Sequence, residues 1–151
     1  MGPGLRIEPV RAAQLEQLLP LIAAYQRFYG VEDVSEERNR DFFRRFLRPS
    51  DDGLLLGAWE QGELLGYACL YWFFTSTRAA ESVLMNDLFV AEEARGRGVG
   101  RALIDASAEV ARQRGADHLE WATAPDNETA RRLYDATGAR HSTWITYELE
   151  L

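Results

Sequence analysis

The chain has 151 residues, a length that predicts one folded domain large enough to bury its own core. Hydrophobic residues make up 46% and charged residues 27%, which argues against a disordered chain and is typical of a globular protein. The net charge of −7 disfavours nucleic acid and anionic membranes as partners, because phosphate binding needs an excess of Lys and Arg on one face. It favours cationic partners instead.

The sequence carries no signal for secretion or membrane insertion. Its longest apolar stretch, residues 64–74, is interrupted by Gly66 and is far shorter than the ~20 residues of a membrane span. The first ten residues lack the basic start and apolar core of a signal peptide, and the single cysteine, Cys69, has no disulfide partner within the chain. We therefore expect a protein of the reducing cytoplasm.

The first fifty residues predict one strand followed by two helices. Residues 5–9 alternate apolar and polar side chains, as a half-buried strand does. Residues 10–29 have helical spacing, with Gly30 placed to end the helix and Pro20 expected to kink it or split it in two. Ser35 is the expected N-cap of the second helix. The apolar side of that helix comprises Phe42, Phe43, Phe46 and Leu47.

Three more strands are expected in the middle of the chain. Residues 54–60 and 63–75 are rich in apolar residues and are joined by a Gln-Gly turn, which predicts a hairpin. Residues 76–81 form a polar connection, and residues 83–90 predict the next strand.

The last third predicts helix, strand, helix and strand. Residues 101–114 have an apolar face and end before Gly115, as a helix does. Residues 118–124 predict a strand, residues 128–136 a short helix closed by Gly138, and residues 142–149 a final strand.

A glycine-rich loop, RGRGVG at residues 95–100, lies between the strand at 83–90 and the following helix. Its glycines, Gly96, Gly98 and Gly100, can adopt positive φ and can approach a ligand without interference from a Cβ atom. The helix would point unpaired N–H groups into this loop, and its arginines add positive charge. The loop therefore predicts a pyrophosphate cradle. A loop that merely starts a helix is the alternative.

Two other phosphate-binding loops are excluded by the residues present. A GxGxxG dinucleotide fingerprint fails in both registers, because Arg101 and Leu103 stand where glycine is required. A Walker loop needs a lysine, and the chain has none.

A second motif, NETARRLYDATG at residues 127–138, places Asn127, Ala130 and Tyr134 on one helical stripe. An amide, a methyl group and a phenol in this order would let an extended chain such as pantetheine lie along the helix. For the helix taken alone, a capping Asn127 and a core Tyr134 are the better interpretation.

Together, the two motifs resemble the GNAT superfamily of N-acetyltransferases. Arg95, Gly98 and Gly100 match its acyl-CoA signature QxxGxG, in which Arg can replace Gln, and the second motif matches NxxAxxLYxxxG. The strings MNDLFV and LEWATAPDN look most like the branch containing yeast histone and polyamine acetyltransferases. The resemblance implies one N-acetyltransferase domain over residues 1–151. Its α/β (α+β) fold would have a mixed, mainly antiparallel sheet of about six to seven strands flanked by about four helices.

The same resemblance implies acetyl-CoA as co-substrate, no metal, and a homodimer. It also implies a primary amine as the acceptor. The acidic composition, with Glu32, Asp33 and Asp87 in the candidate pocket, favours a small cationic molecule or a lysine-like side chain, such as that of a basic peptide. The backbone of the strand before the loop would pair with pantetheine where the sheet splays. The residues expected to bind acetyl-CoA are Leu88, Phe89, Val90, Arg95, Gly96, Arg97, Gly98, Val99, Gly100, Arg101, Asn127, Ala130 and Tyr134.

For catalysis, Tyr134 matches the tyrosine that protonates the departing thiolate in the family after direct attack by the amine. Many relatives carry a glutamate just before the aspartate of the strand preceding the loop, whereas this chain has Asn86 before Asp87. We therefore expect Asp87, ahead of Glu81, to accept the amine proton, through water if necessary. A non-catalytic acyl-CoA sensor or assembly module would keep the glycine loop without needing the phenol.

Three further residues are expected to have structural roles. His118 and His141 are too few and too far apart for a metal site. Cys69 is expected to be a buried thiol rather than a nucleophile.

The aromatic segment at residues 25–33 and the final strand around Tyr147 are expected to shape the acceptor pocket.

Overall fold

The apolar runs in the middle of the chain form the centre of a five-stranded sheet. The structure is a computed structural model that describes residues 4–48 and 50–151. Strand order follows the sequence, and the first four strands are antiparallel while β5 runs parallel to β4. The strands are β1 (Arg6–Pro9), β2 (Gly53–Glu60), β3 (Glu63–Thr75), β4 (Ala80–Val90) and β5 (Leu119–Glu120).

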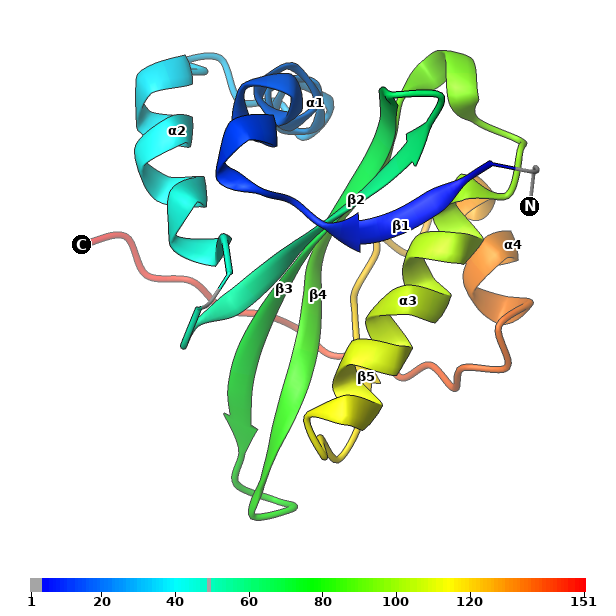
Figure 1. Cartoon of the computed structure of the whole chain (residues 1–151). Coiled ribbons are helices and arrows are strands. Elements are labelled where there is room, and N and C mark those ends of the chain that lie inside the picture. The colour runs from blue at the N-terminus through cyan, green and yellow to red at the C-terminus, as the bar shows by residue number, and fades with distance from the viewer. Residues whose placement is uncertain (1–3, 49) are drawn as a thin grey trace.

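Helices cover both faces of this sheet. Figure 1 shows α1 and α2 on one face and α3 on the other, with α4 beside α3. The helices are α1 (Leu15–Phe28), α2 (Glu36–Phe43), α3 (Val99–Gln113) and α4 (Glu128–Asp135). The mixed α/β fold class is confirmed.

Alternate residues of the central strands enter two different cores. Leu55 of β2 and Tyr67 of β3 pack with α1, whereas Leu56 of β2 and Ala68 of β3 pack with Leu103 of α3. Successive side chains of a strand point to opposite faces. Because helices cover both faces, β2 and the middle of β3 are apolar almost without interruption.

The first helix differs from its prediction in one respect. It begins at Leu15, after a short 3-10 turn at Ala12–Gln14, and continues through Pro20 without splitting. Pro20 lies in the second turn and removes a single backbone hydrogen bond, because it has no N–H to donate. Four buried side chains of this helix pack it onto the sheet and compensate for that loss. The predicted cap of α2 is confirmed, since Ser35 Oγ accepts a hydrogen bond of 3.2 Å from the Arg38 amide.

Two strand predictions need correction. The strand expected at 118–124 is only Leu119–Glu120, because its pairing with β4 ends there. Residues 142–149 form no strand, and their large apolar side chains are exposed. The described sheet therefore has five strands, not six to seven. An alternating pattern indicates a strand only where another strand is present to pair with it.

The length and hydropathy of the helices bear on membrane insertion. Throughout residues 4–48 and 50–151, no helix is both long and apolar enough to cross a membrane.

Candidate active site

The site is built around an irregularity in β4. Cys69 of β3 pairs with Asp87, while the next residue, Leu70, pairs with Met85, so Asn86 is an extra residue in β4. Such a bulge bends the strand and changes the direction of its side chains, and bulges are common beside active sites. The bulge therefore explains why Met85 enters the core beside α3, whereas Asp87, two positions later, contacts Tyr67 on the α1 side of the sheet.

Beyond this point, β4 leaves β5. The two strands pair only at Val83 with Leu119 and at Leu84 with Glu120. In the part of the chain that the structure describes, residues 85–90 have a strand partner on the β3 side alone. This open edge includes Leu88–Val90, whose backbone can hydrogen-bond an extended ligand as another strand would. The predicted splaying of the sheet is present here.

The glycine loop follows this open edge directly. Gly96 and Gly98 have φ of 79° and 82°, a conformation that favours glycine, and a Cβ atom at Gly96 would meet nothing within 4 Å. Helix α3 begins at Val99, and its N-cap Gly98 supplies no side-chain hydrogen bond. The first N–H groups of α3 thus lack a side-chain acceptor, as an anion site at a helix N-terminus requires. These features fit the pyrophosphate of acetyl-CoA.

Gly100 has a different role from the other two loop glycines. A Cβ atom there would lie 3.2 Å from Leu133 Cδ2, so its absence lets α4 approach the start of α3. This close approach places the second sequence motif beside the first.

The three loop arginines contact protein groups in this structure. Arg95 Nε donates to the Val90 carbonyl at 3.0 Å, and its guanidinium lies 5.3 Å from the Phe89 ring centroid. Arg97 pairs with Glu60. Arg101 pairs with Asp105 at 3.1 Å and donates to a carbonyl at the end of α4. The loop's capacity for an anion therefore rests first on its backbone.

Asn127 caps α4, as its capping interpretation predicted. Its Oδ1 accepts a hydrogen bond of 3.1 Å from the Ala130 amide. The side-chain amino group of Asn127 takes no part in this bond and can donate a hydrogen bond to a ligand. Asn127, Ala130 and Tyr134 are each half-buried along α4, so the predicted stripe faces partly toward the protein.

Tyr134 is held in a half-buried position suited to a proton donor. Its ring packs against Trp121, with ring centroids 5.5 Å apart. Burial raises the pKa of the Tyr134 hydroxyl, and the nearby Tyr29 adds to this rise. Tyr134 is therefore protonated at neutral pH.

Asp87 is the buried carboxylate of the site. Its side chain is only 3% exposed; Oδ2 accepts a hydrogen bond of 3.1 Å from the Tyr67 hydroxyl and Oδ1 one of 2.7 Å from the Asn86 amide. Burial raises the pKa of Asp87 to about 6, although these two hydrogen bonds act in the opposite direction. The carboxylate can thus gain and lose a proton close to neutral pH.

Aromatic residues from α1 and β3 cover Asp87. The Tyr25 ring lies 6.2 Å from the Tyr67 ring and 6.0 Å from the Phe89 ring, and the Tyr25 hydroxyl donates to the Asn86 carbonyl at 3.2 Å. The expectation that residues 25–33 help to shape this region fits Tyr25. Tyr67 was missed by sequence reasoning, because a tyrosine in an apolar strand has no local mark of its polar partner.

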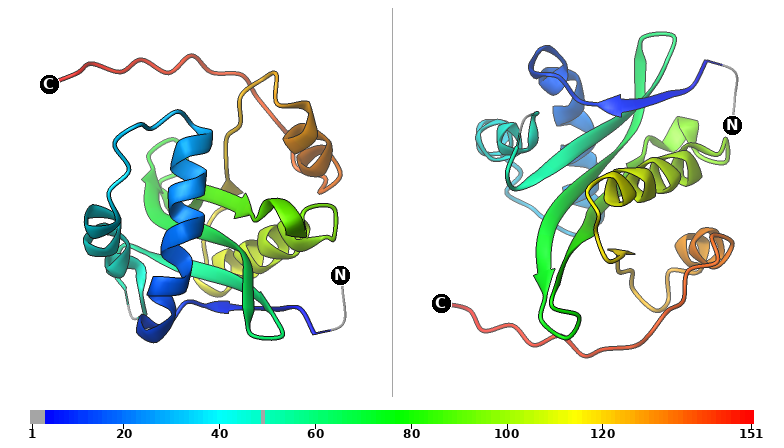
Figure 2. Two further views of the ribbon diagram at one scale, coloured as in Figure 1. Left: turned by 90° about the horizontal axis from the view of Figure 1, so that it is seen from above. Right: turned by 60° about the horizontal axis from the view of Figure 1, so that its bottom comes forward.

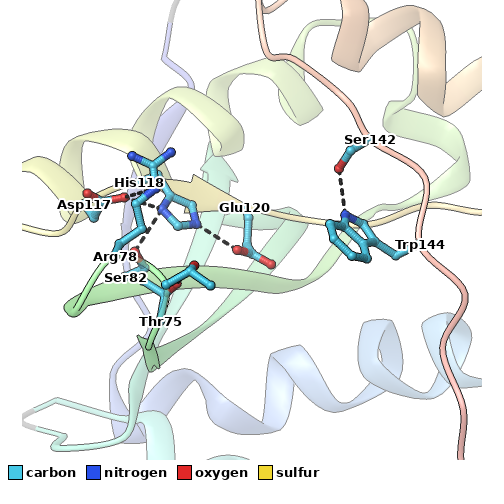
Figure 3. Close-up of polar contacts among 9 residues, drawn as sticks. Thr75, Arg78, Ser82, Asp117, His118, Glu120, Ser142 and Trp144 are labelled. Atoms are coloured by element: carbon cyan, nitrogen blue, oxygen red, sulfur yellow. Dashed lines mark hydrogen bonds and ion pairs between the residues drawn. The ribbon is translucent and has the colours of Figure 1, made fainter.

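The other candidate acid and the histidines lie elsewhere. Glu81 binds Arg114 at the opposite end of β4 from Asp87, so it is not a candidate base. His118 lies where β5 begins, with Nδ1 2.8 Å from Asp117 Oδ2 and Nε2 2.7 Å from Glu120 Oε1, as Figure 3 shows. These two partners, Glu120 first, raise the pKa of His118.

Cys69 and His141 were both expected to have no catalytic role. Cys69 is fully buried, and burial raises its thiol pKa well above the ordinary value, so it stays protonated and unreactive. His141 is exposed. Across the described residues, no group of three or more His, Cys, Asp or Glu side chains could hold a metal ion.

A glycine-rich loop at the start of α3, an open strand edge beside it and a protonated tyrosine on the neighbouring α4 suit a transferase that uses an acyl-CoA co-substrate. The chain belongs to the acetyltransferase (GNAT) family, whose family model matches residues 16–139. Its family assignment makes it an acetyltransferase enzyme, and the sequence-based prediction of the family is confirmed.

Relatives and solved structures agree with this assignment. An uncharacterized N-acetyltransferase of Bacillus subtilis, YhfO, is 30% identical over 95% of both chains. The thialysine N-epsilon-acetyltransferase of Caenorhabditis elegans is 32% identical over 95% of this chain and 89% of its own length. The D-amino-acid N-acetyltransferase HPA3 of Saccharomyces cerevisiae is 38% identical over 61% of this chain and 58% of its own.

Among solved structures, a probable acetyltransferase is 31% identical, with a TM-score of 0.84 over 97% of both chains. The aminoglycoside N-acetyltransferase AAC(6')-Iy, solved in complex with CoA, has a TM-score of 0.85 over 99% of this chain and 97% of its own. At 18% identity, that likeness shows the fold alone.

Proposed function

We propose that this chain is a single N-acetyltransferase domain that transfers an acetyl group from acetyl-CoA to a primary amine. The amine would belong to a small cationic molecule or a lysine-like side chain. The observation that carries this proposal is that β4 contributes both an open backbone edge at Leu88–Val90 and the buried Asp87, while α4 presents the protonated Tyr134. In this proposal, the co-substrate site and the two proton-transfer groups would share one region.

For acetyl-CoA, the chain offers three sets of groups. Backbone N–H groups of residues 95–100 would hold the pyrophosphate, the edge of Leu88–Val90 would hold the pantetheine amides, and the Asn127 amino group would add one donor. When bound, acetyl-CoA supplies a thioester whose carbonyl carbon a neutral amine can attack. Backbone N–H groups at the end of β4 would stabilise the developing oxyanion.

Two protons must move in this reaction, one from the amine and one to the departing sulfur. Tyr134 keeps its proton at neutral pH and would donate it to the sulfur. Asp87 would take the amine proton. Because both of its oxygens are hydrogen-bonded and its side chain is 3% exposed, the proton would reach it through a water.

The net charge and the thialysine acetyltransferase relative support a cationic acceptor. The chain carries a net charge of −7, and Glu32 is exposed just beyond α1, whereas the neighbouring Asp33 pairs with Arg38 at 3.7 Å. The names of two relatives describe N-acetylation, of thialysine at its epsilon nitrogen and of D-amino acids. We therefore favour two kinds of acceptor, the side-chain amine of a basic amino acid and a polyamine.

A thiol-release assay with acetyl-CoA tests the proposal. The panel should include polyamines, lysine and thialysine, D-amino acids, aminoglycosides and basic peptides. We expect release of CoA to be fastest with a cationic primary amine and to depend on both amine and enzyme. If every amine failed while CoA still bound in a titration, the chain would not have the proposed activity.

A further inference from the structure

The extra residue of the β4 bulge, Asn86, is the one exposed residue of that strand, all of which is described. Successive side chains of a regular strand point to opposite faces, but a bulge sets two residues against one on the partner strand. The Asn86 side chain contacts Tyr71, which packs against the core on the α1 side. The Asp87 side chain contacts Tyr67, which lies in the same core. The bulge thus brings two consecutive polar side chains to one face of the sheet.

The carboxylate of Asp87 fixes the orientation of the Asn86 side chain. The amino group of Asn86 donates to Asp87 Oδ1 at 2.7 Å and to the Tyr71 hydroxyl at 3.4 Å. An ionised carboxylate only accepts hydrogen bonds, so the amino group of the amide must face it and the oxygen must lie on the other side. Within residues 4–48 and 50–151, this oxygen, Asn86 Oδ1, has no hydrogen-bond partner.

The main chain of Asn86 is anchored as well. A bulge leaves its extra residue outside the ladder, so the carbonyl of that residue needs a partner from elsewhere. The Tyr25 hydroxyl provides one, since it donates to the Asn86 carbonyl at 3.2 Å. Tyr25 belongs to α1, which lies across this face of the sheet (Figure 2), and its ring packs edge-on against Tyr67 and Phe89. The unpartnered oxygen is therefore held in one position beside Asp87.

A fixed, exposed oxygen next to the proposed base can accept a hydrogen bond from the nucleophile. A neutral primary amine has two N–H groups and one lone pair. In the proposed reaction, the lone pair forms the C–N bond as the C–S bond breaks, one amine proton passes through water to Asp87, and Tyr134 protonates the sulfur. The second N–H stays on nitrogen in the amide product, so it can donate to a neutral oxygen throughout the transfer.

We propose that Asn86 Oδ1 accepts a hydrogen bond from the second N–H of the acceptor amine and thereby selects primary over secondary amines. The inference rests on the proposed function and deepens it, since it names the residue that orients the nucleophile. Asp87 takes the departing proton, whereas Asn86 only accepts a hydrogen bond. A secondary amine has a single N–H, whose proton leaves to Asp87 during the reaction, so no N–H remains for Asn86.

The first test compares putrescine with N,N′-dimethylputrescine in the unaltered enzyme and in Asn86→Leu. Leucine has the shape of asparagine without its polar groups. We expect kcat/KM of the unaltered enzyme to favour the primary diamine, and Asn86→Leu to reduce this preference by roughly tenfold or more. Loss of the amino group beside Asp87 affects both amines alike, so it cancels from the ratio. CoA should bind both proteins with equal affinity, and an unchanged preference would overturn the proposal.

Asn86→Asp is the matched control, because it has the same shape and keeps an acceptor oxygen. A proton shared between the adjacent carboxylates can replace the amide donor to Asp87. This variant should retain the preference for the primary diamine within about threefold. Circular dichroism checks that both variants fold. Equal losses of preference in Asn86→Asp and Asn86→Leu would mean a general disturbance of the bulge and would overturn the proposal.

A measurement on the unaltered chain does not depend on the folding of any variant. With CoA bound and no acetyl group present, titration with putrescine should move the ¹³Cγ resonance of Asn86 in a saturable way, whereas fully N-methylated putrescine, which has no N–H, should not move it. A resonance that stays in place while putrescine binds would overturn the role of Asn86. Failure of the acetyl-CoA-loaded chain to acetylate any amine would reject the proposed function and this inference together.

Discussion

At the scale of single residues, burial decides the chemistry of the site. Asp87 and Tyr67 lie on neighbouring strands with their side chains in contact, and both have raised pKa values because water is largely excluded around them. Tyr134 is half-buried, and burial raises its pKa further above neutral, so its hydroxyl keeps its proton. One region therefore contains an acid with its proton retained and a carboxylate able to accept one.

We expect Tyr134→Phe to lower kcat by roughly 10²-fold or more while the affinity for CoA changes little. The phenyl ring can still pack on Trp121, so only the proton donor is lost. Steady-state kinetics and calorimetric titration of CoA measure the two quantities. An unchanged kcat at neutral pH would make Tyr134 a packing residue and assign the acid elsewhere.

Asp87→Asn should reduce activity and increase stability. The native carboxyl holds its proton up to about pH 6, while the unfolded chain loses it near 3.8, so the free energy of unfolding falls as pH rises between these values and stays lower above them. Removing this charge should raise the free energy of unfolding at pH 7 by roughly 1–3 kcal/mol, with no gain near pH 4. Urea unfolding at both pH values measures the difference.

The same variant has a kinetic signature. In the unaltered enzyme, kcat/KM should fall more steeply below about pH 6, where Asp87 becomes protonated, than above it, where only the amine titrates. Asp87→Asn should lose this change of slope and lower kcat by roughly 10²-fold. If kcat/KM of the variant still fell more steeply below about pH 6, the base would be another group.

At the scale of elements, the start of α3 has two functions. Gly96 and Gly98 shape the loop that exposes N–H groups, while Gly100 lets α4 pack close by. A short run of glycines thus forms the proposed anion site and also sets the position of Tyr134.

We expect Gly98→Glu to abolish CoA binding, because a carboxylate would enter the proposed phosphate site. Gly115→Glu is a matched control, since Gly115 also has positive φ, 70°, but follows the other end of α3. Calorimetric titration with CoA and circular dichroism compare binding and folding. Equal affinities in the two folded variants would remove the loop from the ligand site.

At the scale of the whole molecule, net charge influences which acceptors arrive. With a charge of −7, the surface attracts cations, and exposed charges are screened over about 8 Å at physiological ionic strength. This attraction acts before any contact in the site is made, so it affects kcat/KM more than kcat.

We therefore expect kcat/KM for spermidine, measured at saturating acetyl-CoA, to fall roughly threefold or more between low and high salt. An anionic amino acid should show no such fall. Initial rates for both acceptors at several salt concentrations provide the comparison. A preference for the anion would reject the cationic acceptor and leave the family assignment intact.

The sequence by itself determined the local features of this protein. Helical spacing, the Ser35 cap and the glycines of residues 95–100 depend on neighbours a few positions away, so their patterns were sufficient. The family resemblance rested on two such local motifs, and it also indicated Asp87 and Tyr134.

Only the tertiary structure decided features that depend on distant partners. The bulge at Asn86 arises from the pairing of β3 with β4, and the raised pKa of Asp87 arises from burial beside Tyr67, twenty positions away in sequence. The strand expected at 142–149 lacks a partner in its own sheet. Alternation specifies which face of a strand is apolar, but backbone hydrogen bonds require a second strand, and its location is a property of the folded molecule.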